Sequence, residues 1–372
     1  MIVPPFTEET EAFRAAVREF VETELKPHVP EWEAAEYFPD EVFGWFAERG
    51  WLGVTMPKEY GGLGREQVFG GVMSEELSRA GSGGLVAGIG AHMGIACPPV
   101  ARFGTDAQKQ RWLVPALRAE KLAALAITEP GGGSDVASVR TKAERVDGGW
   151  LVNGEKTFIT NGVRADFYVT AVKTTSEGGH GGMSFLVIEK GEGVSASALH
   201  KLGWHASDTG TVAFADVFVP EDHLLGELDK GFYLIMANFQ GERLGMALGA
   251  LGEMRASFEA TVEWAAAQPP SPWRKYQIAE LGLKVETSAA MAYGALRRAC
   301  AGEDIVREVS MAKLLTQRAN LEVQEGCLGL MGLEGADAEL GLERSLRDSR
   351  LGPIGGGTDE IMKEIIGRSF GL

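Results

Sequence analysis

Two segments place small hydroxyl side chains beside glycines or a predicted turn. Residues 127–135 read Ile-Thr-Glu-Pro-Gly-Gly-Gly-Ser-Asp, and residues 158–162 read Phe-Ile-Thr-Asn-Gly. The intervening Asp147-Gly148-Gly149 and Asn153-Gly154 predict tight turns between short strands, so Thr128 and Thr160 should lie at neighbouring strand ends. Hydroxyls and unobstructed backbone N–H groups there could contact a flat ring with polar edges. Taken alone, residues 131–133 are more simply explained as a bare turn.

A carboxylate lies on the apolar face of a predicted long helix. Ile235, Phe239, Glu242 and Met246 follow one another at helical spacing and share one face. Burial raises the pKa of such a carboxyl, which suits it to remove a proton from carbon. An ion pair of Glu242 with Arg243 or with another chain explains the same position, and spacing alone does not decide between the two.

The elements that position these residues follow from hydrophobic periodicity. Residues 7 to about 124 predict helices, with Pro27 and Pro30 breaking the first, and residues 125 to about 225 predict strands and turns, including a hairpin over 150–160. Helices return from Lys230 to about Gln268 and over 275–301 and 303–330, followed by a glycine-punctuated loop and one last helix. We therefore expect an α+β chain with an N-terminal α-helical domain (1–124), a middle β domain (125–228) and a C-terminal α-helical domain (229–372).

Composition narrows the function classes. The chain has 372 residues, 45% of them hydrophobic, and a formal net charge of −16, which argues against binding nucleic acid or anionic membranes. Its three cysteines (Cys97, Cys300 and Cys327) form no CxxC pair, so we expect buried structural thiols rather than a disulfide framework or a metal site. We find no signal peptide and no apolar run long enough to span a bilayer, and expect a cytoplasmic enzyme without membrane insertion. A glycine-rich connection over 174–182 should be exposed.

Five motifs, in order and nearly end to end, resemble the acyl-CoA dehydrogenase family. They are Met56-Pro-Lys-Glu-Tyr-Gly-Gly-Leu-Gly, Phe103-Gly-Thr-Asp-Ala-Gln-Lys-Gln-Arg-Trp-Leu-Val-Pro, the Thr128–Asp135 block, Leu202-Gly-Trp-His-Ala-Ser-Asp-Thr and Gly355-Gly-Gly-Thr-Asp-Glu-Ile-Met-Lys-Glu. The resemblance implies a helical N-terminal domain, a middle β-barrel or β-sandwich and a C-terminal four-helix bundle.

The resemblance also implies a function. The cofactor would be FAD, and an acyl-CoA thioester would be desaturated to the trans-2-enoyl-CoA. A glutamate would remove the α proton while the β hydride passes to flavin N5, and electrons would leave to an electron-transferring flavoprotein. Donors aimed at the thioester oxygen would stabilise its enolate-like charge. A homo-oligomer, a dimer or a dimer of dimers, is implied, and a hetero-oligomer stays open.

Site residues carry over by position. The residues that resemble the family's flavin contacts are Ile127, Thr128, Ser134, Phe158, Thr160, Thr358 and Glu360. Many members have tryptophan where Phe158 stands. Ser134, Arg243 and Gly355 match substrate-binding positions, and the Arg243 fork suits CoA phosphate or carbonyl oxygens.

The position of the catalytic base differs between branches of the family. Many relatives carry it just before a C-terminal Gly-Thr, where this chain has Gly356, which cannot abstract a proton. The isovaleryl and long-chain branches place it on the first helix of the C-terminal domain, in a Glu-Arg pair that is Glu242-Arg243 here. Position and resemblance therefore converge on Glu242 as the base. Gly356 would contribute its backbone N–H to the thioester oxygen.

Two family features are missing, and both concern a neighbouring subunit's contribution to FAD. The Arg-x-x-Phe-Gly segment before Gln277 is shortened and lacks Phe-Gly, and the later Gln-x-x-Gly-Gly-x-Gly loop has Gly329 and Leu333 at two of its positions. Three explanations for the missing features remain: the protein binds FAD more weakly, a second subunit type supplies the contacts, or other residues such as Arg274 substitute for them.

Other functions remain as alternatives. An acyl-CoA oxidase would perform the same half-reaction with oxygen as acceptor, although the chain lacks that group's large extra C-terminal domain. A flavin-poor subunit of a mixed oligomer fits the missing features but not the retained Glu242. No G-x-G-x-x-G lies between a strand and a helix, which disfavours a nicotinamide enzyme.

The small residues over 84–94 either leave room for a medium, long or branched acyl chain or serve helix packing. His92 and His205 are expected to be packing or hydrogen-bonded residues. No arginine is evident for a distal substrate carboxylate, which argues against decarboxylation.

Overall fold

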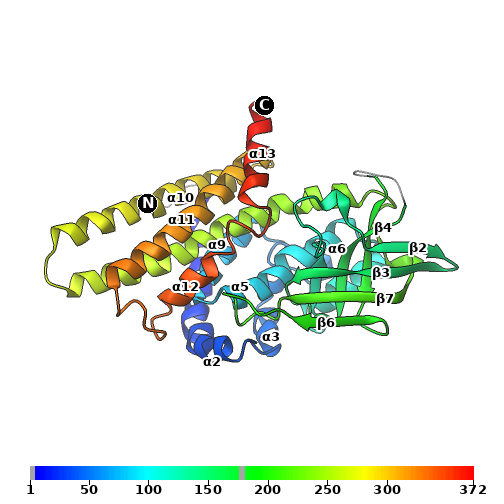
Figure 1. Ribbon diagram of the computed structural model, residues 1–372, viewed down its shortest axis with the longest axis horizontal. Helices are drawn as coiled ribbons and strands as arrows, with labels where there is room; N and C mark the ends of the chain where they lie inside the picture. Colours follow the sequence, from blue (N-terminus) through cyan, green and yellow to red (C-terminus); the bar gives the residue numbers. More distant parts are fainter. Residues whose placement is uncertain (1–4, 176–180) are drawn as a thin grey trace.

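The computed structural model describes residues 5–175 and 181–372, arranged as a helical N-terminal part, a sheet and a second helical part (Figure 1). The N-terminal helices are α1 (Glu8–Phe20), α2 (Val29–Ala34), α3 (Glu41–Glu48), α4 (Gln67–Leu77), α5 (Gly83–Gly90), α6 (Cys97–Phe103), α7 (Asp106–Gln108) and α8 (Val114–Leu117). One buried apolar cluster joins all three parts, because Trp112, Phe167 and Leu248 all belong to it. The predicted three-part α+β fold is confirmed. The connection expected over 174–182 lies mostly outside the described residues.

Pro27 and Pro30 do not end the helical path as predicted. A π-helical turn over Val21–Leu25 leads into a 3₁₀ turn over Lys26–His28 and then into α2. Each proline lies in the first turn of a new helical segment, where its missing N–H leaves no hydrogen bond unmade.

One apolar stretch is longer than we expected. Residues Gly83–Phe103, which run through α5, a π-helical segment over Ala91–Ala96 and α6, form one helix of 21 residues with a mean hydropathy of 1.4 over its most apolar window. By length and composition this helix could cross a membrane, so the expectation that no such run exists was wrong. In the structure 56% of that window is buried inside the protein.

Within residues 5–175 and 181–372 the sheet contains eight strands. They are β1 (Ala123–Ala126), β2 (Lys142–Val146), β3 (Gly149–Ile159), β4 (Phe167–Lys173), β5 (Met183–Glu189), β6 (Val194–Ala198), β7 (Gly210–Pro220) and β8 (Leu224–Leu225). Their order is β6-β7-β3-β2-β4-β5-β8, and β1 pairs in parallel with β4 outside this path. The sheet lies at the opposite end of the molecule from the α10–α11 helices (Figure 1).

Of the two turns predicted between Thr128 and Thr160, one exists. Gly148 has φ +75° and links β2 to β3 as a hairpin. Asn153-Gly154 is not a turn, because β3 runs through it and its register with β7 shifts between Val152 and Gly154. A Cβ on Gly154 would lie 2.6 Å from the Thr141 hydroxyl, so this glycine permits close approach at a β-bulge. The hairpin predicted over 150–160 was therefore wrong.

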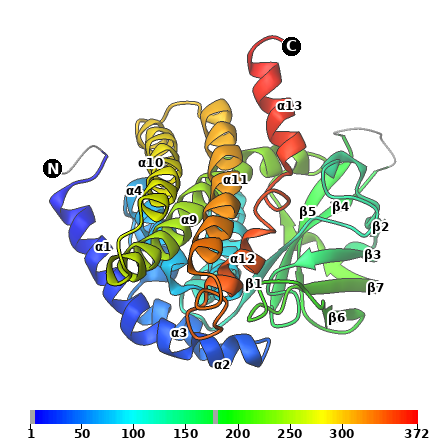
Figure 2. The same ribbon diagram turned by 60° about the vertical axis from the view of Figure 1, so that its left-hand side comes forward.

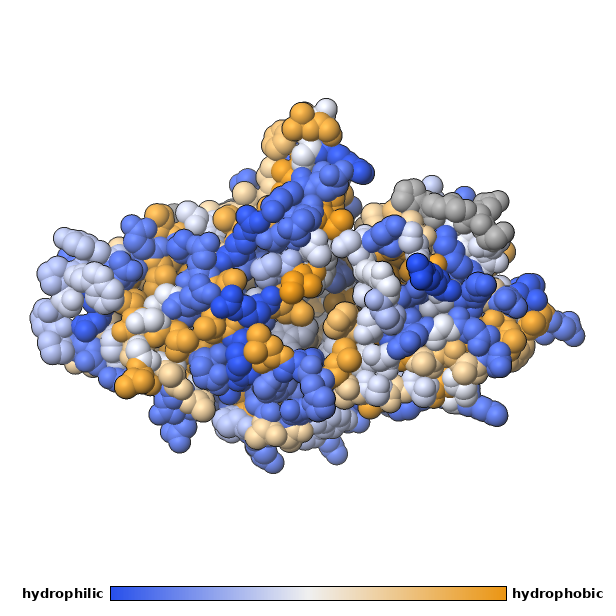
Figure 3. Space-filling view, viewed as in Figure 1, coloured by the Kyte–Doolittle hydropathy of each residue, from blue (hydrophilic) through white to orange (hydrophobic). Residues whose placement is uncertain are grey.

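The C-terminal part is built on three long helices. They are α9 (Gly231–Ala267), α10 (Pro272–Cys300) and α11 (Val306–Met331), followed by α12 (Leu342–Ser349) and α13 (Asp359–Ser369). We did not predict α12. Helix α9 extends from the far end of the bundle to the sheet, while α13 projects from the body (Figures 1 and 2). The tip of α13 is apolar on the molecular surface, where Phe370 and Leu372 are exposed (Figure 3).

The cysteines only partly match the expectation. Cys97 and Cys327 are buried free thiols, whereas Cys300, the last residue of α10, is exposed. The last residue of a helix has fewer packing neighbours than a residue at its centre. The apolar character of Cys300 therefore did not predict its exposure.

Candidate functional site

A buried ion pair fixes the Thr128 segment to the sheet. The Glu129 carboxylate accepts hydrogen bonds from the backbone N–H groups of Arg140 (2.6 Å) and Thr141 (2.8 Å), and from the Lys156 ammonium at 2.9 Å. Lys156 is fully buried and also donates to the Ile127 carbonyl at 3.1 Å. Burial lowers the pKa of Lys156 to about 8, and the charge of Glu129 opposes that shift. The pair thus holds the turn after β1 against β3.

We expect Lys156→Met to lower the free energy of unfolding by about 3–5 kcal/mol, because it leaves the Glu129 charge buried without its partner. Urea unfolding followed by circular dichroism measures the change. Lys142→Met, at an exposed lysine on β2, should change it by less than about 0.5 kcal/mol. Equal stability of the two variants would contradict an anchoring role for the pair.

The two hydroxyl segments lie side by side, as the sequence predicts. The Thr157 backbone N–H donates to the Thr128 carbonyl at 2.9 Å, which joins the two segments directly. Thr160 follows the end of β3, and its hydroxyl lies 3.2 Å from that of Thr209. Both Thr128 and Thr160 are half-buried.

An exposed aromatic ring and an open glycine turn flank these hydroxyls. Phe158 is 69% exposed and has φ +57°, at a point where the β3–β7 register is irregular. A Cβ on Gly131 or Gly132 would meet nothing within 4 Å, and Ser134 is exposed. Left-handed backbone at a non-glycine residue is uncommon and concentrates at functional sites. An exposed ring beside hydroxyl side chains and open backbone fits a planar group such as a flavin.

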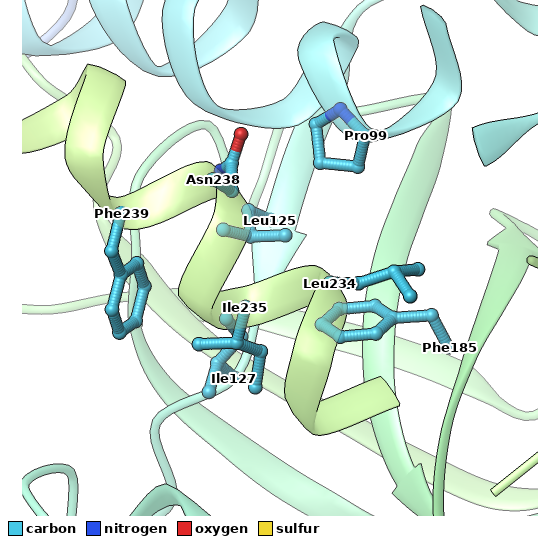
Figure 4. Close-up of a pocket in the computed structure, with 8 residues that line it drawn as sticks. All are labelled: Pro99, Leu125, Ile127, Phe185, Leu234, Ile235, Asn238 and Phe239. Atoms are coloured by element: carbon cyan, nitrogen blue, oxygen red, sulfur yellow. The ribbon is translucent and has the colours of Figure 1, made fainter. Parts of the chain in front are cut away.

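Helix α9 carries the carboxylate toward the same region. A small apolar pocket lies between α6, the sheet and the first turns of α9 (Figure 4). Its lining residues are Pro99, Leu125, Ile127, Phe185, Leu234, Ile235, Asn238 and Phe239. Ile127 belongs to the segment that leads to Thr128, and Phe239 lies one helical turn before Glu242. The pocket therefore connects the two features found in the sequence.

Glu242 has the electrostatics of a base that works near neutral pH. Burial raises the pKa of its carboxyl to about 7, while the positive charges of Arg243 and Lys313 oppose that shift. Its Oε2 atom is buried and has no hydrogen-bond partner among the described residues. Over those residues no ion pair within 4.0 Å involves Glu242, so the proposed ion pair with Arg243 receives no support, whereas a pair with another chain is not tested by a single chain.

The glycine run before α13 lies against this carboxylate. Gly356 has φ +62°, and a Cβ built on it would lie 3.5 Å from Glu242 Oε1 and would overlap the Met246 sulfur. Arg243 is 5% exposed, and its Nε atom donates to the Gly356 carbonyl at 3.4 Å. Gly355 is the residue before this contact and is half-buried. The structure therefore brings Glu242, Arg243 and the glycine run together.

The two remaining predicted contacts lie just beyond the glycine run. The Thr358 hydroxyl accepts from the Ile361 backbone N–H at 3.3 Å and caps α13. Glu360 is exposed in the first turn of α13. Thr358 has a structural task of its own, and neither residue contacts the Thr128–Ser134 segment through a hydrogen bond among those described.

One buried charge at this site was missed. Lys313 on α11 is fully buried and donates to the carbonyls of Gly352 (2.8 Å) and Gly357 (2.6 Å). Its position on the buried side of an amphipathic helix was the only signal in the sequence, and a lysine there reads equally well as a surface residue.

The other sequence predictions concern packing. A Cβ on Gly84 would lie 2.6 Å from the Ser207 nitrogen, and one on Gly88 would lie 2.6 Å from the Phe38 ring, so both serve close packing. A Cβ on Gly90 or Gly94 would meet nothing within 4 Å, so packing does not require a glycine at either position. His92 is fully buried and hydrogen-bonded through both ring nitrogens, and burial lowers its pKa to about 4. His205 lies 2.9 Å from the Lys201 carbonyl, so both histidines are hydrogen-bonded as expected.

Both departures from the family pattern lie at one end of the bundle. Trp264 lies near the end of α9, and its indole N–H donates at 2.7 Å to Glu334, a residue just after the end of α11. Arg274 stacks on Trp264 at 5.1 Å and donates to the Pro269 carbonyl, so it is engaged within its own turn. Leu333 is 94% exposed.

Comparisons with known proteins cover the whole chain. Family models described as acyl-CoA dehydrogenase N-terminal, middle and C-terminal domains match residues 7–120, 124–217 and 229–371. Mitochondrial isovaleryl-CoA dehydrogenase of Solanum tuberosum is 34% identical over 98% of this chain and 91% of its own length. A crystal structure of an acyl-CoA dehydrogenase from Geobacillus kaustophilus is 36% identical over the full length of both chains, with a TM-score of 0.96. A structure titled as the FAD complex of PigA is 25% identical, also over both full lengths, with a TM-score of 0.95.

Proposed function

Because the chain belongs to the acyl-CoA dehydrogenase family, an FAD-dependent group of oxidoreductases, we propose that it oxidises an acyl-CoA to the trans-2-enoyl-CoA with Glu242 as the base. The observation that carries this proposal is a carboxylate on a half-buried residue whose Oε2 atom is buried and unpartnered among the described residues, beside a glycine turn and one helical turn from an apolar pocket. A solvated carboxylate is too weak a base for carbon at neutral pH, and burial corrects that weakness.

Each part of the site has a task in this reaction. The residues that would hold the flavin are Phe158, Thr128, Thr160, Ser134 and Ile127, and Thr358 and Glu360 would make further contacts with FAD. The chemistry that bound FAD supplies is acceptance of a hydride at N5. Glu242 takes the α proton onto its carboxylate oxygen.

Two groups would bind and polarise the substrate. The Gly356 backbone N–H, beside Glu242, would donate to the thioester oxygen and stabilise the charge that develops there. Ser134, Gly355 and Arg243 would contact the CoA portion. Arg243 donates weakly to the Gly356 carbonyl over 3.4 Å, and its other guanidinium N–H groups, which have no hydrogen-bond partner among the described residues, could make that contact.

We further propose an electron-transferring flavoprotein as the acceptor, a homo-oligomeric assembly and a cytoplasmic location. Family membership supports the first two. Similarity to acyl-CoA dehydrogenases of Clostridium acetobutylicum and Bacillus subtilis supports the third, while the plant relatives are named as mitochondrial. An acyl-CoA oxidase would share the Glu242 chemistry, so the acceptor must be measured directly.

The decisive experiment is anaerobic titration of the purified, FAD-loaded protein with straight and branched acyl-CoAs of increasing length. Loss of the oxidised flavin's visible absorbance supports the proposal, and the chain that bleaches it fastest identifies the substrate class. Reoxidation by an electron-transferring flavoprotein but not by air would assign a dehydrogenase, whereas fast reoxidation by air would assign an oxidase. A homomer that binds no FAD would instead indicate a flavin-poor subunit.

The pKa of Glu242 predicts the pH dependence of that reduction. Only the ionised carboxylate accepts a proton, so we expect the reduction rate to rise from about pH 6 to about pH 8 with a midpoint near its pKa of about 7. Stopped-flow absorbance under saturating acyl-CoA measures this profile. A rate that is flat over this range would show that another group, or no titrating group, removes the proton.

A further inference from the structure

Lys313 is a buried cation to which neither a motif nor the reaction scheme assigns a task. It lies on α11 with no exposed surface. Its ammonium donates to the carbonyls of Gly352 and Gly357, at the two ends of the turn between α12 and α13. Burying an ammonium is costly, so its retention here calls for a partner or a function.

The turn that Lys313 holds is the one that meets Glu242. Arg243 binds the carbonyl of Gly356, between the two carbonyls that Lys313 binds. Two of the enclosed residues, Gly356 and Gly357, have positive φ values of +62° and +97°. A glycine-rich turn of this kind has many accessible conformations, so anchoring its ends to one rigid helix selects the conformation that places Gly356 beside the carboxylate.

The charges around Lys313 also bear on Glu242. Those facing it are Glu242 and Arg243 on α9 and Asp359 on α13, and Asp359 is itself paired at 2.6 Å with Arg318 on α11. Burial lowers the pKa of Lys313 to about 8, partly opposed by Asp359 and Glu242. The lysine therefore remains mostly protonated near neutral pH, and its positive charge favours the ionised form of Glu242.

We propose that Lys313 is a positioning residue for this site, whose ammonium holds the Gly352–Gly357 turn against Glu242 and whose charge favours the ionised form of that carboxylate. This inference rests on the proposed function, in which Glu242 is the base and Gly356 lies at the thioester. It gives Lys313 two separable tasks. The hydrogen bonds set the geometry of the turn, and the charge sets the protonation state of the base.

The test compares Lys313→Gln, Lys313→Met and Lys313→Arg with Lys284→Met as the control. Lys284 is a half-buried lysine of α10 that pairs with Glu322. Glutamine keeps N–H donors but removes the charge. Methionine removes the donors and the charge, and arginine keeps the donors and the charge. The first readout is the titration of the Glu242 carboxyl by infrared difference spectroscopy on the FAD-loaded protein, with the band assigned by its absence in Glu242→Gln. This readout needs no turnover.

We expect Lys313→Gln and Lys313→Met to raise the Glu242 midpoint by roughly 0.5–1 pH unit. The pH profile of flavin reduction should move in the same direction. Lys313→Arg should restore the wild-type midpoint, because it restores the charge. Lys313→Met should additionally lower the maximal reduction rate at high pH more than Lys313→Gln does, because it also releases the turn.

An unchanged midpoint in either neutral variant that folds, judged by circular dichroism, overturns the role of the charge. Equal maximal rates in Lys313→Met and wild type overturn the role in holding the turn. These failures are distinct from failure of the proposed function, in which no acyl-CoA reduces the wild-type flavin although the infrared titration of the Glu242 carboxyl still shifts in the Lys313 variants.

Discussion

Glu242→Gln is expected to retain bound FAD and to lose reduction by acyl-CoA by at least about 10³-fold, near the upper range for removal of a general base. Glutamine has nearly the shape of glutamate and keeps an oxygen at the site, but its amide does not accept a proton from carbon. The variant should also relieve the cost of a buried carboxyl, so its free energy of unfolding should equal or exceed that of the wild type. Anaerobic stopped-flow absorbance gives the rate, and the ratio of flavin to protein absorbance gives the occupancy.

The chain offers a matched control on the same helix. Glu253 is another half-buried glutamate of α9, and burial raises its pKa to about 8, but Asn320 donates to it at 2.7 Å and it makes no hydrogen bond to the glycine turn among the described residues. Glu253→Gln should therefore leave the reduction rate within about twofold of wild type. Rapid bleaching in Glu242→Gln, or an equal loss in both variants, would remove Glu242 from its assigned role.

Sequence reasoning reached Glu242 because helical periodicity is a local property. Four residues within a span of twelve suffice to place the carboxylate on the face that carries Ile235 and Phe239, and the structure places both in the adjacent pocket. The neighbouring hydroxyl segments were also found, since the turn at Gly148 folds β2 back on β3 and leaves Thr128 next to Thr157. These features depend on residues close in the sequence.

Lys313 was not identified from the sequence as a residue of the site, because its partners are distant in the chain. The residues it binds, Gly352 and Gly357, follow it by 39 and 44 positions, and nothing local distinguishes a lysine that caps distant carbonyls from a solvated one. Helix α12 was not predicted from the sequence for a related reason. It is short, and its Asp348 accepts hydrogen bonds from the backbones of Gly83 and Trp204, so residues far away in the chain fix its place.

Asn153-Gly154 shows how one local pattern can serve two structures. The pair suits a two-residue hairpin turn and equally suits a bulge in a continuous strand. The contact of Gly154 with Thr141 on the adjoining segment decides in favour of the bulge, and that contact exists only after the sheet has formed. Tertiary packing therefore determined the outcome at the positions where local reasoning was wrong.

Gly356→Ala tests the geometry of the glycine turn rather than the base itself. At φ +62° an alanine costs about 1–2 kcal/mol of backbone strain, and its methyl group would overlap the Met246 sulfur and lie 3.5 Å from Glu242 Oε1. The turn or Met246 must move, and a displacement of about 1 Å in positioned groups can lower a rate by about 10²-fold. We therefore expect flavin reduction to slow by roughly 10–100-fold, with the free energy of unfolding lowered by about 1–2 kcal/mol.

A double variant separates the two causes of that loss. Met246→Ala in the Gly356→Ala background removes the overlap but keeps the backbone strain, so the reduction rate should recover by more than the stability does. Gly294→Ala, inside α10 where a methyl group meets nothing within 4 Å, is the control: it should leave the reduction rate unchanged and raise the free energy of unfolding by about 0.5–1 kcal/mol, the usual gain from glycine to alanine in a helix. If Gly356→Ala reduces its flavin at the wild-type rate, the turn does not contact the reacting thioester. The placement of Gly356 as the donor to its oxygen would then have to be abandoned, while the assignment of Glu242 as the base would stand on its own test.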